Sequence, residues 1–281
     1  MNTPVLSHYQ AKELLDARAA GKERAIVSLD LERSKSEIFL DDAHIVLPDG
    51  QRLQWGRLQE IQENELACFA ILEGELERIQ AYSEAFSRYY SLMPTKSAPT
   101  MLISGIPMHR IKDTNPYKDT MSKIRAVAPL GGPLLDTTMG LGYTAIEASR
   151  TADHVTTIEL DPAVVEICRG NPWSQELFDN PKITRLIGDA YDLILEFDDH
   201  SFTRVIHDPP MFSLAGDLYS GEFYRELYRV LRPSGRLFHY IGDPKSRSGR
   251  NVTRGVVRRL QESGFKRVKS YPQAFGVVGY K

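Results

Sequence analysis

Apolar runs and helical periods alternate along the second part of the chain. Runs that predict strands lie at 133–136, 155–159, 183–187, 203–207 and 236–241, with a closing pair near 265–270 and 274–280. Between them the apolar positions follow a helical spacing, as in the stretch that begins at Tyr143. Continuous apolar strands that alternate with helices are typical of a mostly parallel sheet covered on both faces. We expect the last two strands to form an antiparallel hairpin.

The first hundred residues show a different pattern. Residues 8–20 predict a helix, and β-type runs follow at 25–31, 37–40, 44–47, 51–55 and 66–72, with a hairpin turn at Asp49-Gly50. Five further apolar residues follow at helical spacing and predict another helix: Leu76, Ile79, Tyr82, Phe86 and Tyr90. We expect this stripe to face the core, and a surface that stacks on nucleic acid bases is the minor alternative.

The best linker in the sequence is the stretch PTKSAP at 94–99. It places a domain boundary near residue 100. Residues 1–100 then form a small mixed α/β domain, with substrate binding or dimerisation as its expected role. Residues 101–281 form the larger α/β domain, which carries the chemistry.

Composition is that of a globular protein with a sizeable core, since 42% of the 281 residues are hydrophobic and 26% are charged. No apolar run approaches the roughly 20 residues that cross a bilayer, and the first residues lack the apolar core of a secretory signal. Cys68 and Cys168 are the only cysteines, and both lie in apolar contexts. We expect a cytoplasmic protein with two buried thiols, no membrane association and no metal.

Charge is distributed unevenly along the chain. The formal net charge is −2, yet residues 243–281 hold ten Lys or Arg and two acids, a net charge of +8. The other 242 residues therefore carry −10. This asymmetry indicates an anionic partner for the C-terminal part of the chain.

A glycine turn follows the first strand of the larger domain. The apolar run that begins at Pro133 ends in Asp136, and Gly140 and Gly142 precede a helix. The next strand ends in Glu159, 23 residues after Asp136. Strand, glycine turn, helix, strand and acid is the layout of a nucleotide-binding unit, in which the acid can accept ribose hydroxyls. An ordinary parallel sheet with a glycine turn is the simpler alternative.

This segment resembles motifs I and II of class I S-adenosylmethionine (SAM) methyltransferases, in which glycines follow an acid at intervals of two residues. The corresponding positions are Thr138, Gly140 and Gly142, so the first glycine is replaced. Dinucleotide dehydrogenases share the layout but usually lack the acid at Asp136. The resemblance implies SAM as cofactor and a Rossmann-like methyltransferase sheet. It implies that Glu159, with Leu160 beside it, contacts the ribose.

The third strand ends in Gly188-Asp189. In the methyltransferases that this chain resembles, an acid here commonly binds the adenine amino group. The resemblance therefore implies a cofactor contact for Asp189 and its neighbour Ala190. Asp189 also stands where it would cap a helix over 190–196.

The fourth strand ends in His207-Asp208-Pro209-Pro210-Met211-Phe212. It resembles motif IV of amino-methyltransferases, an acid or amide followed by Pro-Pro and an aromatic residue. A carboxylate and a proline carbonyl can accept both N–H groups of a weakly nucleophilic base amine, and fixed proline φ angles aim them. Met211 occupies the aromatic position, so the stacking role passes to Phe212. A rigid proline turn without catalytic role is the alternative.

Arg250, Arg254 and Arg258 are spaced four residues apart and are expected on one face of a helix that ends at Gly264. Their planar guanidinium groups suit phosphate, whereas an ordinary solvated face is the alternative. Together with the residues before the glycine turn, the motifs resemble an archaeal family of predicted methyltransferases over roughly the last 175 residues.

Three functions follow from these features. The first is a SAM-dependent methyltransferase that acts on cytosine N4 or adenine N6. We expect its substrate to be RNA (rRNA or tRNA) rather than DNA. The second is a spermidine synthase-like aminopropyltransferase, because residues 218–237 also resemble that family. The third is an RNA-binding relative without catalysis. The sequence indicates neither the number of methyl groups added nor the oligomeric state.

Overall fold

The computed structural model describes residues 3–210, 215–243 and 246–281. The chain forms two compact units, and each is assembled from two segments. Unit 1 is Met1–Tyr117 with Ala163–Gln175, and unit 2 is Lys118–Pro162 with Glu176–Lys281.

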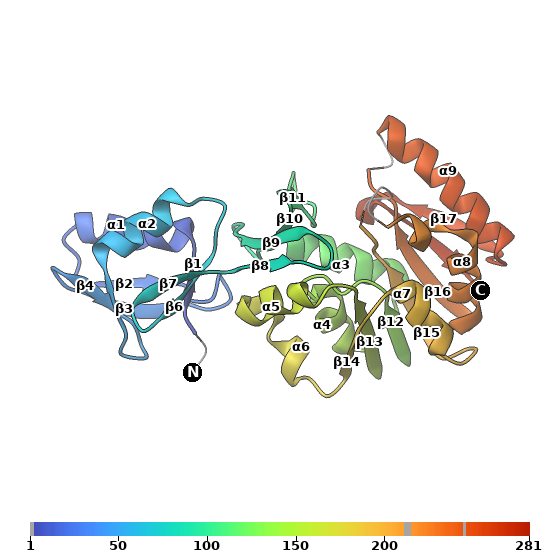
Figure 1. Ribbon diagram of the computed structural model, residues 1–281, viewed down its shortest axis with the longest axis horizontal. Helices are drawn as coiled ribbons and strands as arrows, with labels where there is room; N and C mark the ends of the chain where they lie inside the picture. Colours follow the sequence, from blue (N-terminus) through green and yellow to red (C-terminus); the bar gives the residue numbers. More distant parts are fainter. Residues whose placement is uncertain (1–2, 211–214, 244–245) are drawn as a thin grey trace. The chain divides into compact units, whose positions relative to one another are not determined.

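Unit 2 is built on a seven-stranded sheet (Figure 1) with the order β14-β13-β12-β15-β16-β18-β17. Strands β12 to β16 run parallel, whereas β18 is antiparallel to both β16 and β17. This arrangement confirms the expected Rossmann-like sheet with antiparallel closing strands. The strands are β12 (Pro133–Asp136), β13 (His154–Glu159), β14 (Ile183–Ile187), β15 (Phe202–His207), β16 (Leu231–Tyr240), β17 (Arg267–Tyr271) and β18 (Gly276–Tyr280).

The helices of unit 2 bury amphipathic faces against this sheet. Phe223 and Leu227 of α8 and Val256 and Leu260 of α9 join Val205 of β15 in one buried cluster. Removing such apolar side chains from water is the main stabilising contribution. The helices are α3 (Pro116–Val127, which begins in unit 1), α4 (Tyr143–Ser149), α6 (Glu176–Asp179), α7 (Ala190–Leu193), α8 (Gly221–Val230) and α9 (Arg247–Glu262).

Unit 1 contains three small antiparallel sheets, with orders β1-β6-β7, β2-β3-β4-β5 and β11-β10-β9-β8. Helices α1 (His8–Ala19) and α2 (Trp55–Glu63) supply Leu14, Leu58 and Ile61 to its buried core. Helix α5 (Pro162–Gly170) falls largely in this unit. The strands are β1 (Val5–Leu6), β2 (Arg24–Val27), β3 (Ser36–Leu40), β4 (His44–Val46), β5 (Arg52–Gln54), β6 (Phe69–Leu72), β7 (Glu75–Arg78), β8 (Gln80–Ser83), β9 (Arg88–Met93), β10 (Thr100–Ile103) and β11 (Ile106–Pro107).

Two local features of unit 1 follow directly from the sequence. Ser7 caps α1, and Gln10 Oε1 accepts a hydrogen bond from the backbone N–H of Ser7, which completes a capping box. The two cysteines, Cys68 and Cys168, are buried and reduced, as expected.

The helix expected over residues 76–90 is wrong. This stretch forms strands β7 and β8 and the start of β9. Ile79 and Tyr90 are buried, but Tyr82 and Phe86 are exposed. Tyr82 pairs across the hairpin with Tyr89, and such aromatic cross-strand pairs favour strands. The apolar residues thus satisfied a helical spacing by coincidence.

Residues 94–99 connect β9 to β10, and these strands pair with each other. The stretch expected as a linker is therefore a hairpin connection. The position near residue 100 lies inside unit 1, which continues to Tyr117. Among the described residues, no helix has the length and apolar character needed to cross a membrane.

Candidate functional site

The carboxyl ends of four neighbouring strands bring the predicted acids to one edge of the sheet. Asp136 ends β12, Glu159 ends β13, Asp189 follows β14 and Asp208 follows β15. These strands are adjacent in the order β14-β13-β12-β15. In open parallel sheets, ligands bind at this edge, where the chain order reverses.

The backbone of the turn between β12 and α4 adopts conformations that favour glycine. Gly140 has φ +52° and Gly142 has φ +75°, conformations that L side chains rarely adopt. A Cβ on Gly142 would lie 2.2 Å from Leu177, whereas a Cβ on Gly140 would meet nothing within 4 Å. Thr138 is not among the residues with positive φ, so threonine replaces the family's first glycine without backbone strain.

Asp136 is fully buried, and its Oδ2 accepts a hydrogen bond from Thr157 Oγ1 at 2.9 Å. Burial raises the pKa of Asp136 to about 7, with a further contribution from the Asp208 charge. This carboxyl is therefore partly protonated at neutral pH.

Glu159 supports the glycine turn directly. Its Oε2 accepts from Gly140 N at 3.0 Å, and its Oε1 accepts from Asp161 N at 3.1 Å. Burial raises the pKa of Glu159 to about 7 although these hydrogen bonds act in the opposite direction. The side chain that should contact ribose thus also holds the backbone over which the cofactor would lie.

The third strand tip carries the other predicted cofactor residues. Asp189 caps α7, and its Oδ1 accepts from Tyr191 N at 2.8 Å. Helix capping by Asp189 is therefore confirmed, and it leaves the adenine contact as a prediction. Ala190 is buried, whereas Leu160, after β13, is 38% exposed.

These residues fit a nucleoside cofactor. Thr138 Oγ1 is a buried hydroxyl with no hydrogen-bond partner among the residues that the structure describes. Beside it, Gly140 leaves open the space that a side chain would fill. Buried polar atoms are normally paired, so this hydroxyl is suited to a ligand that brings its own polar groups.

The Asp208-Pro209-Pro210 turn is held at both ends. The buried Tyr219 donates its hydroxyl to Pro210 O at 3.0 Å. His207 Nε2 lies 2.9 Å from Leu218 O, which can only accept, so Nε2 carries the proton. Within the described residues, no hydrogen bond to Pro209 O is found. Met211 and Phe212 lie outside the described residues, so the stacking role of Phe212 stays a prediction.

A buried network lies beneath this turn. His207 Nδ1 is 2.7 Å from Thr137 Oγ1, and His239 Nε2 is 2.7 Å from Tyr224 OH. Burial lowers the pKa of His207 to about 3 and that of His239 well below its ordinary value. Both rings are therefore neutral at neutral pH and take part in this network through hydrogen bonds.

Sequence reasoning missed Lys123 of α3. Its Nζ lies 2.5 Å from Asp208 Oδ2 and 2.9 Å from Asp119 Oδ2. The sequence shows only that Asp119, Lys123 and Val127 fall four residues apart, and the structure places all three on the buried face of this helix. A buried charge at a core position of a helix indicates a specific partner.

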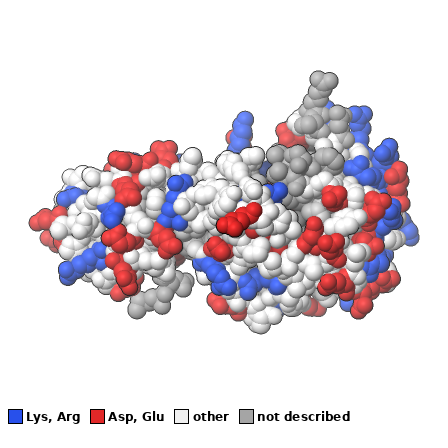
Figure 2. Space-filling model, viewed as in Figure 1, with Lys and Arg blue, Asp and Glu red and all other residues white. Residues whose placement is uncertain are grey.

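The three predicted arginines lie on α9, as the spacing predicted. Arg250, Arg254 and Arg258 are exposed, and Arg258 forms a long ion pair with Glu262 at 3.6 Å. Figure 2 shows basic side chains along the course of this helix. Because α9 follows the carboxyl end of β16, its first turns belong to the same edge of the sheet as Asp208.

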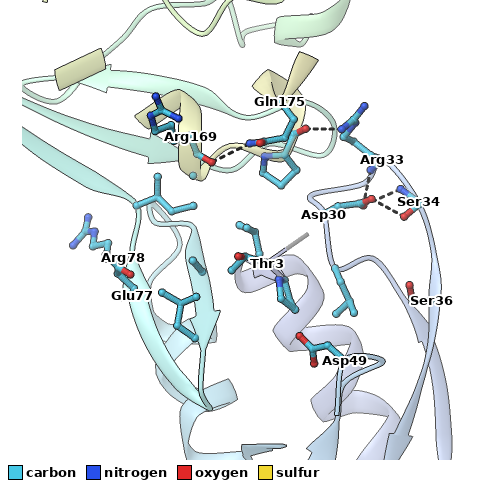
Figure 3. A pocket seen from close by; sticks show the side chains of 18 of the residues that line it. Thr3, Asp30, Arg33, Ser34, Ser36, Asp49, Glu77, Arg78, Arg169 and Gln175 are labelled. Atoms are coloured by element: carbon cyan, nitrogen blue, oxygen red, sulfur yellow. Dashed lines mark hydrogen bonds between the residues drawn. The ribbon is translucent and has the colours of Figure 1, made fainter. Parts of the chain in front are cut away.

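A separate cavity of about 790 Å³ lies within unit 1. Figure 3 shows that Arg33, Arg78 and Arg169 share its lining with Asp30 and Glu77. This mixture of charges identifies no class of ligand, and none of the predicted site residues that the structure describes lines the cavity. No group of metal-ligating side chains occurs among the described residues.

Known proteins resemble this chain in sequence. A family model described as "Methyltransferase domain" matches residues 135–239. The uncharacterized protein MJ1233 of Methanocaldococcus jannaschii is 46% identical over 279 residues, which covers 96% of this chain and 93% of that protein. A polyamine aminopropyltransferase of Sulfolobus acidocaldarius is 32% identical over 111 residues, 37% of each chain.

A solved structure shares the fold. Spermidine synthase of Thermotoga maritima has a TM-score of 0.57 and 18% identity, and the match covers 72% of this chain and 70% of that one. The match of residues 135–239 to the methyltransferase domain model identifies a class I methyltransferase domain in this chain. The chain is an enzyme of the methyltransferase class, and SAM is its cofactor.

Proposed function

We propose that this chain, which belongs to the same family as protein MJ1233 of Methanocaldococcus jannaschii, methylates the exocyclic amino group of a base in RNA, at cytosine N4 or adenine N6. The observation that carries the proposal is the Asp208-Pro209-Pro210 turn at the end of β15, next to the glycine turn after β12.

The cofactor residues have distinct tasks in this proposal. Glu159 accepts the ribose hydroxyls, Asp189 accepts from the adenine amine, and Gly140 lets the cofactor approach the backbone. When bound, SAM supplies an electrophilic methyl group.

The acceptor amine is held by two oxygens. One N–H donates to the Asp208 carboxylate and the other to the Pro209 carbonyl, while Tyr219 holds the adjacent Pro210 carbonyl. These bonds orient the nitrogen lone pair, so that the new N–C bond would form as the S–C bond of the sulfonium breaks and its electron pair returns to sulfur. One N–H proton then leaves to water. Correct orientation contributes much of the rate in such displacements. A base paired within a duplex must leave the helix to reach this edge.

RNA is the proposed partner because of charge. Arg250, Arg254 and Arg258 are exposed on α9, in a segment of net charge +8. Nucleic acid phosphates are the anions that such a surface attracts. We propose that the enzyme works in the cytoplasm, where this RNA would be available.

Aminopropyl transfer is the second candidate. It is favoured by the similarity to proteins named polyamine aminopropyltransferase, which covers about a third of the chain in the Sulfolobus acidocaldarius case. Two features weigh against it. The basic α9 would repel a polyamine, and Asp208 is already paired with Lys123.

The test is methyl transfer from labelled SAM to ribosomal and transfer RNA transcribed in vitro, followed by mass spectrometry of the nucleosides. Asp208→Ala should lower the rate at least about a hundredfold, because the amine loses the group that orients it. Asp208→Asn should keep part of the rate, since its carbonyl still accepts one bond.

Two controls accompany this test. SAM affinity, measured by calorimetry, should stay within about twofold in Asp208→Ala. Asp153→Ala removes an exposed aspartate at the opposite edge of the sheet and should behave as wild type. Wild-type transfer by Asp208→Ala would refute the mechanism, and transfer to putrescine from decarboxylated SAM would favour the second candidate.

A further inference from the structure

A buried ion triad joins α3 to the catalytic turn. Lys123 is 3% exposed and Asp119 is 1% exposed, whereas Asp208 is 22% exposed. Lys123 Nζ bridges the two carboxylates at 2.9 Å and 2.5 Å. A charge so deeply buried persists only with partners of this kind.

Lys123 stays positively charged at neutral pH. Burial alone lowers the pKa of Lys123, but Asp208 and Asp119 together raise it above its ordinary value. Among the described residues, the titratable groups near the pair include Asp136 on β12, Tyr219 before α8 and Tyr240 on β16. Burial raises the pKa of both Asp136 and Tyr219. Neither carboxyl nor phenol groups can carry the positive charge that Lys123 supplies.

We propose that Lys123 is a positioning residue that keeps Asp208 as a charged hydrogen-bond acceptor and thereby restricts the substrate to an amine that is already neutral. This inference rests on the proposed amino-methyltransferase reaction and specifies its substrate class.

The restriction follows from acid–base chemistry. An alkyl amine such as a polyamine is an ammonium with a pKa of about 10, so it must lose a proton to a base before its nitrogen can react. An opposite charge within about 4–6 Å favours the carboxylate over its protonated form by roughly one to three pH units. Asp208 beside Lys123 is therefore a poor base.

The exocyclic amine of a nucleobase does not need to lose a proton before it reacts. Its nitrogen is neutral and needs acceptors that align its lone pair. The paired Asp208 suits this role, because Lys123 fixes one carboxylate oxygen, Oδ2, while the amine donates to the same carboxylate. Charge and geometry thus both select a conjugated amine.

The first test measures the titration of Asp208 without substrate. Carboxyl ¹³C NMR of aspartate-labelled full-length protein, assigned by loss of the signal in Asp208→Asn, gives the midpoint directly. In Lys123→Met the midpoint should rise by at least about one pH unit. Arg125→Met removes an exposed charge from the same helix and should leave the midpoint unchanged.

Lys123→Met leaves Asp119 buried beside an apolar side chain, which can impair folding. The double variant Asp119→Asn with Lys123→Met removes both buried charges and should show the same rise. A midpoint that stays within about 0.3 units of wild type in a folded variant overturns the inference.

The second test is the pH profile of methyl transfer to RNA. Wild-type rates should vary less than about twofold between pH 6 and 8. The rate of Lys123→Met should fall as the pH drops below the raised midpoint of Asp208, since a protonated carboxyl accepts an N–H more weakly than a carboxylate. Lys123→Arg should restore the flat profile. A protein with only a structural role for Lys123 would lose rate equally at every pH.

The two hypotheses fail in different ways. If no RNA is methylated but the Asp208 midpoint shifts as expected, the proposed substrate is wrong and the charge pairing stands. If the wild-type enzyme transfers to putrescine at a rate comparable to RNA, the restriction to neutral amines is wrong.

Discussion

At the scale of single residues, the strand tips carry two carboxyls that titrate near neutrality. Burial raises the pKa of both Asp136 and Glu159 to about 7 from ordinary values of 3.8 and 4.5. The folded protein therefore holds protons that the unfolded chain releases. Without cofactor, these two groups make stability fall as pH rises from about 4 to 7.

SAM binding should depend on pH for the same reason. Ribose hydroxyls donate hydrogen bonds, so they require Glu159 as carboxylate. Below pH 7 the affinity should fall by up to about tenfold per pH unit, and binding at pH 7 should release protons. Calorimetry in buffers of different ionisation enthalpy measures both effects.

Glu159→Gln is the matching variant. Its affinity at pH 8 should be at least about tenfold weaker, because hydrogen bonds to a charged acceptor contribute roughly 1.5–3 kcal/mol. Its remaining pH dependence should be that of Asp136 alone. Wild-type affinity with an unaltered pH profile would remove Glu159 from the cofactor site.

At the scale of elements, the glycine turn separates packing from ligand space. Both glycines have positive φ, so alanine at either costs about 1–2 kcal/mol. Gly142→Ala also drives a Cβ into Leu177, and overpacking adds roughly 1–3 kcal/mol. A Cβ on Gly140 would meet no described residue within 4 Å, apart from its chain neighbours.

We therefore expect opposite phenotypes from the two substitutions. Gly142→Ala should show the larger loss in denaturant unfolding, with SAM affinity reduced only through stability. Gly140→Ala should lose only about 1–2 kcal/mol to backbone strain yet bind SAM at least about tenfold more weakly, because its methyl group fills the space left for the ligand. Equal stability losses with equal affinities would contradict this division.

Helix α9 gives the corresponding test of the RNA contact. Affinity for RNA should fall with salt, with a log–log slope of about −0.7 to −0.9 per phosphate contacted. Changing Arg250, Arg254 and Arg258 to Gln should reduce the slope by the contribution of about two to three phosphate contacts. SAM affinity should stay unchanged.

The same charge change elsewhere provides the control. Lys12, Lys22 and Arg24 are exposed in unit 1, and their replacement by Gln should leave the slope at its wild-type value. If both triple variants flatten it equally, the effect is one of net charge and α9 is ordinary solvated surface.

At the scale of the whole molecule, the sequence was informative where local pattern decides structure. The strand tips at Asp136, Glu159 and Asp189 followed from apolar runs and turn residues, which lie within a few positions of each other. The helix prediction for residues 76–90 was wrong because the apolar positions fitted both a helical and a strand period. Only the cross-strand pairing of Tyr82 with Tyr89 distinguishes the two.

The Lys123–Asp208 contact could not be predicted in this way. Its partners are 85 residues apart, on α3 and after β15. On a helix, Asp119 and Lys123 four residues apart resemble an ordinary surface pair. Their burial depends on how the helix is oriented on the sheet, and no local pattern records that orientation.

The discontinuous assembly of unit 1 bears on synthesis at the ribosome. Trp173 Nε1 donates to Leu31 O at 2.8 Å, and Arg33 donates to Pro172 O, so residues 163–175 complete a body whose main segment ends at Tyr117. Domains generally fold as units, N-terminal first, as the chain emerges. Here the first unit must wait until residue 175 has left the exit tunnel, after much of the second has been translated. A nascent chain arrested before that point should remain sensitive to protease at its N-terminal part, whereas one released beyond it should be protected.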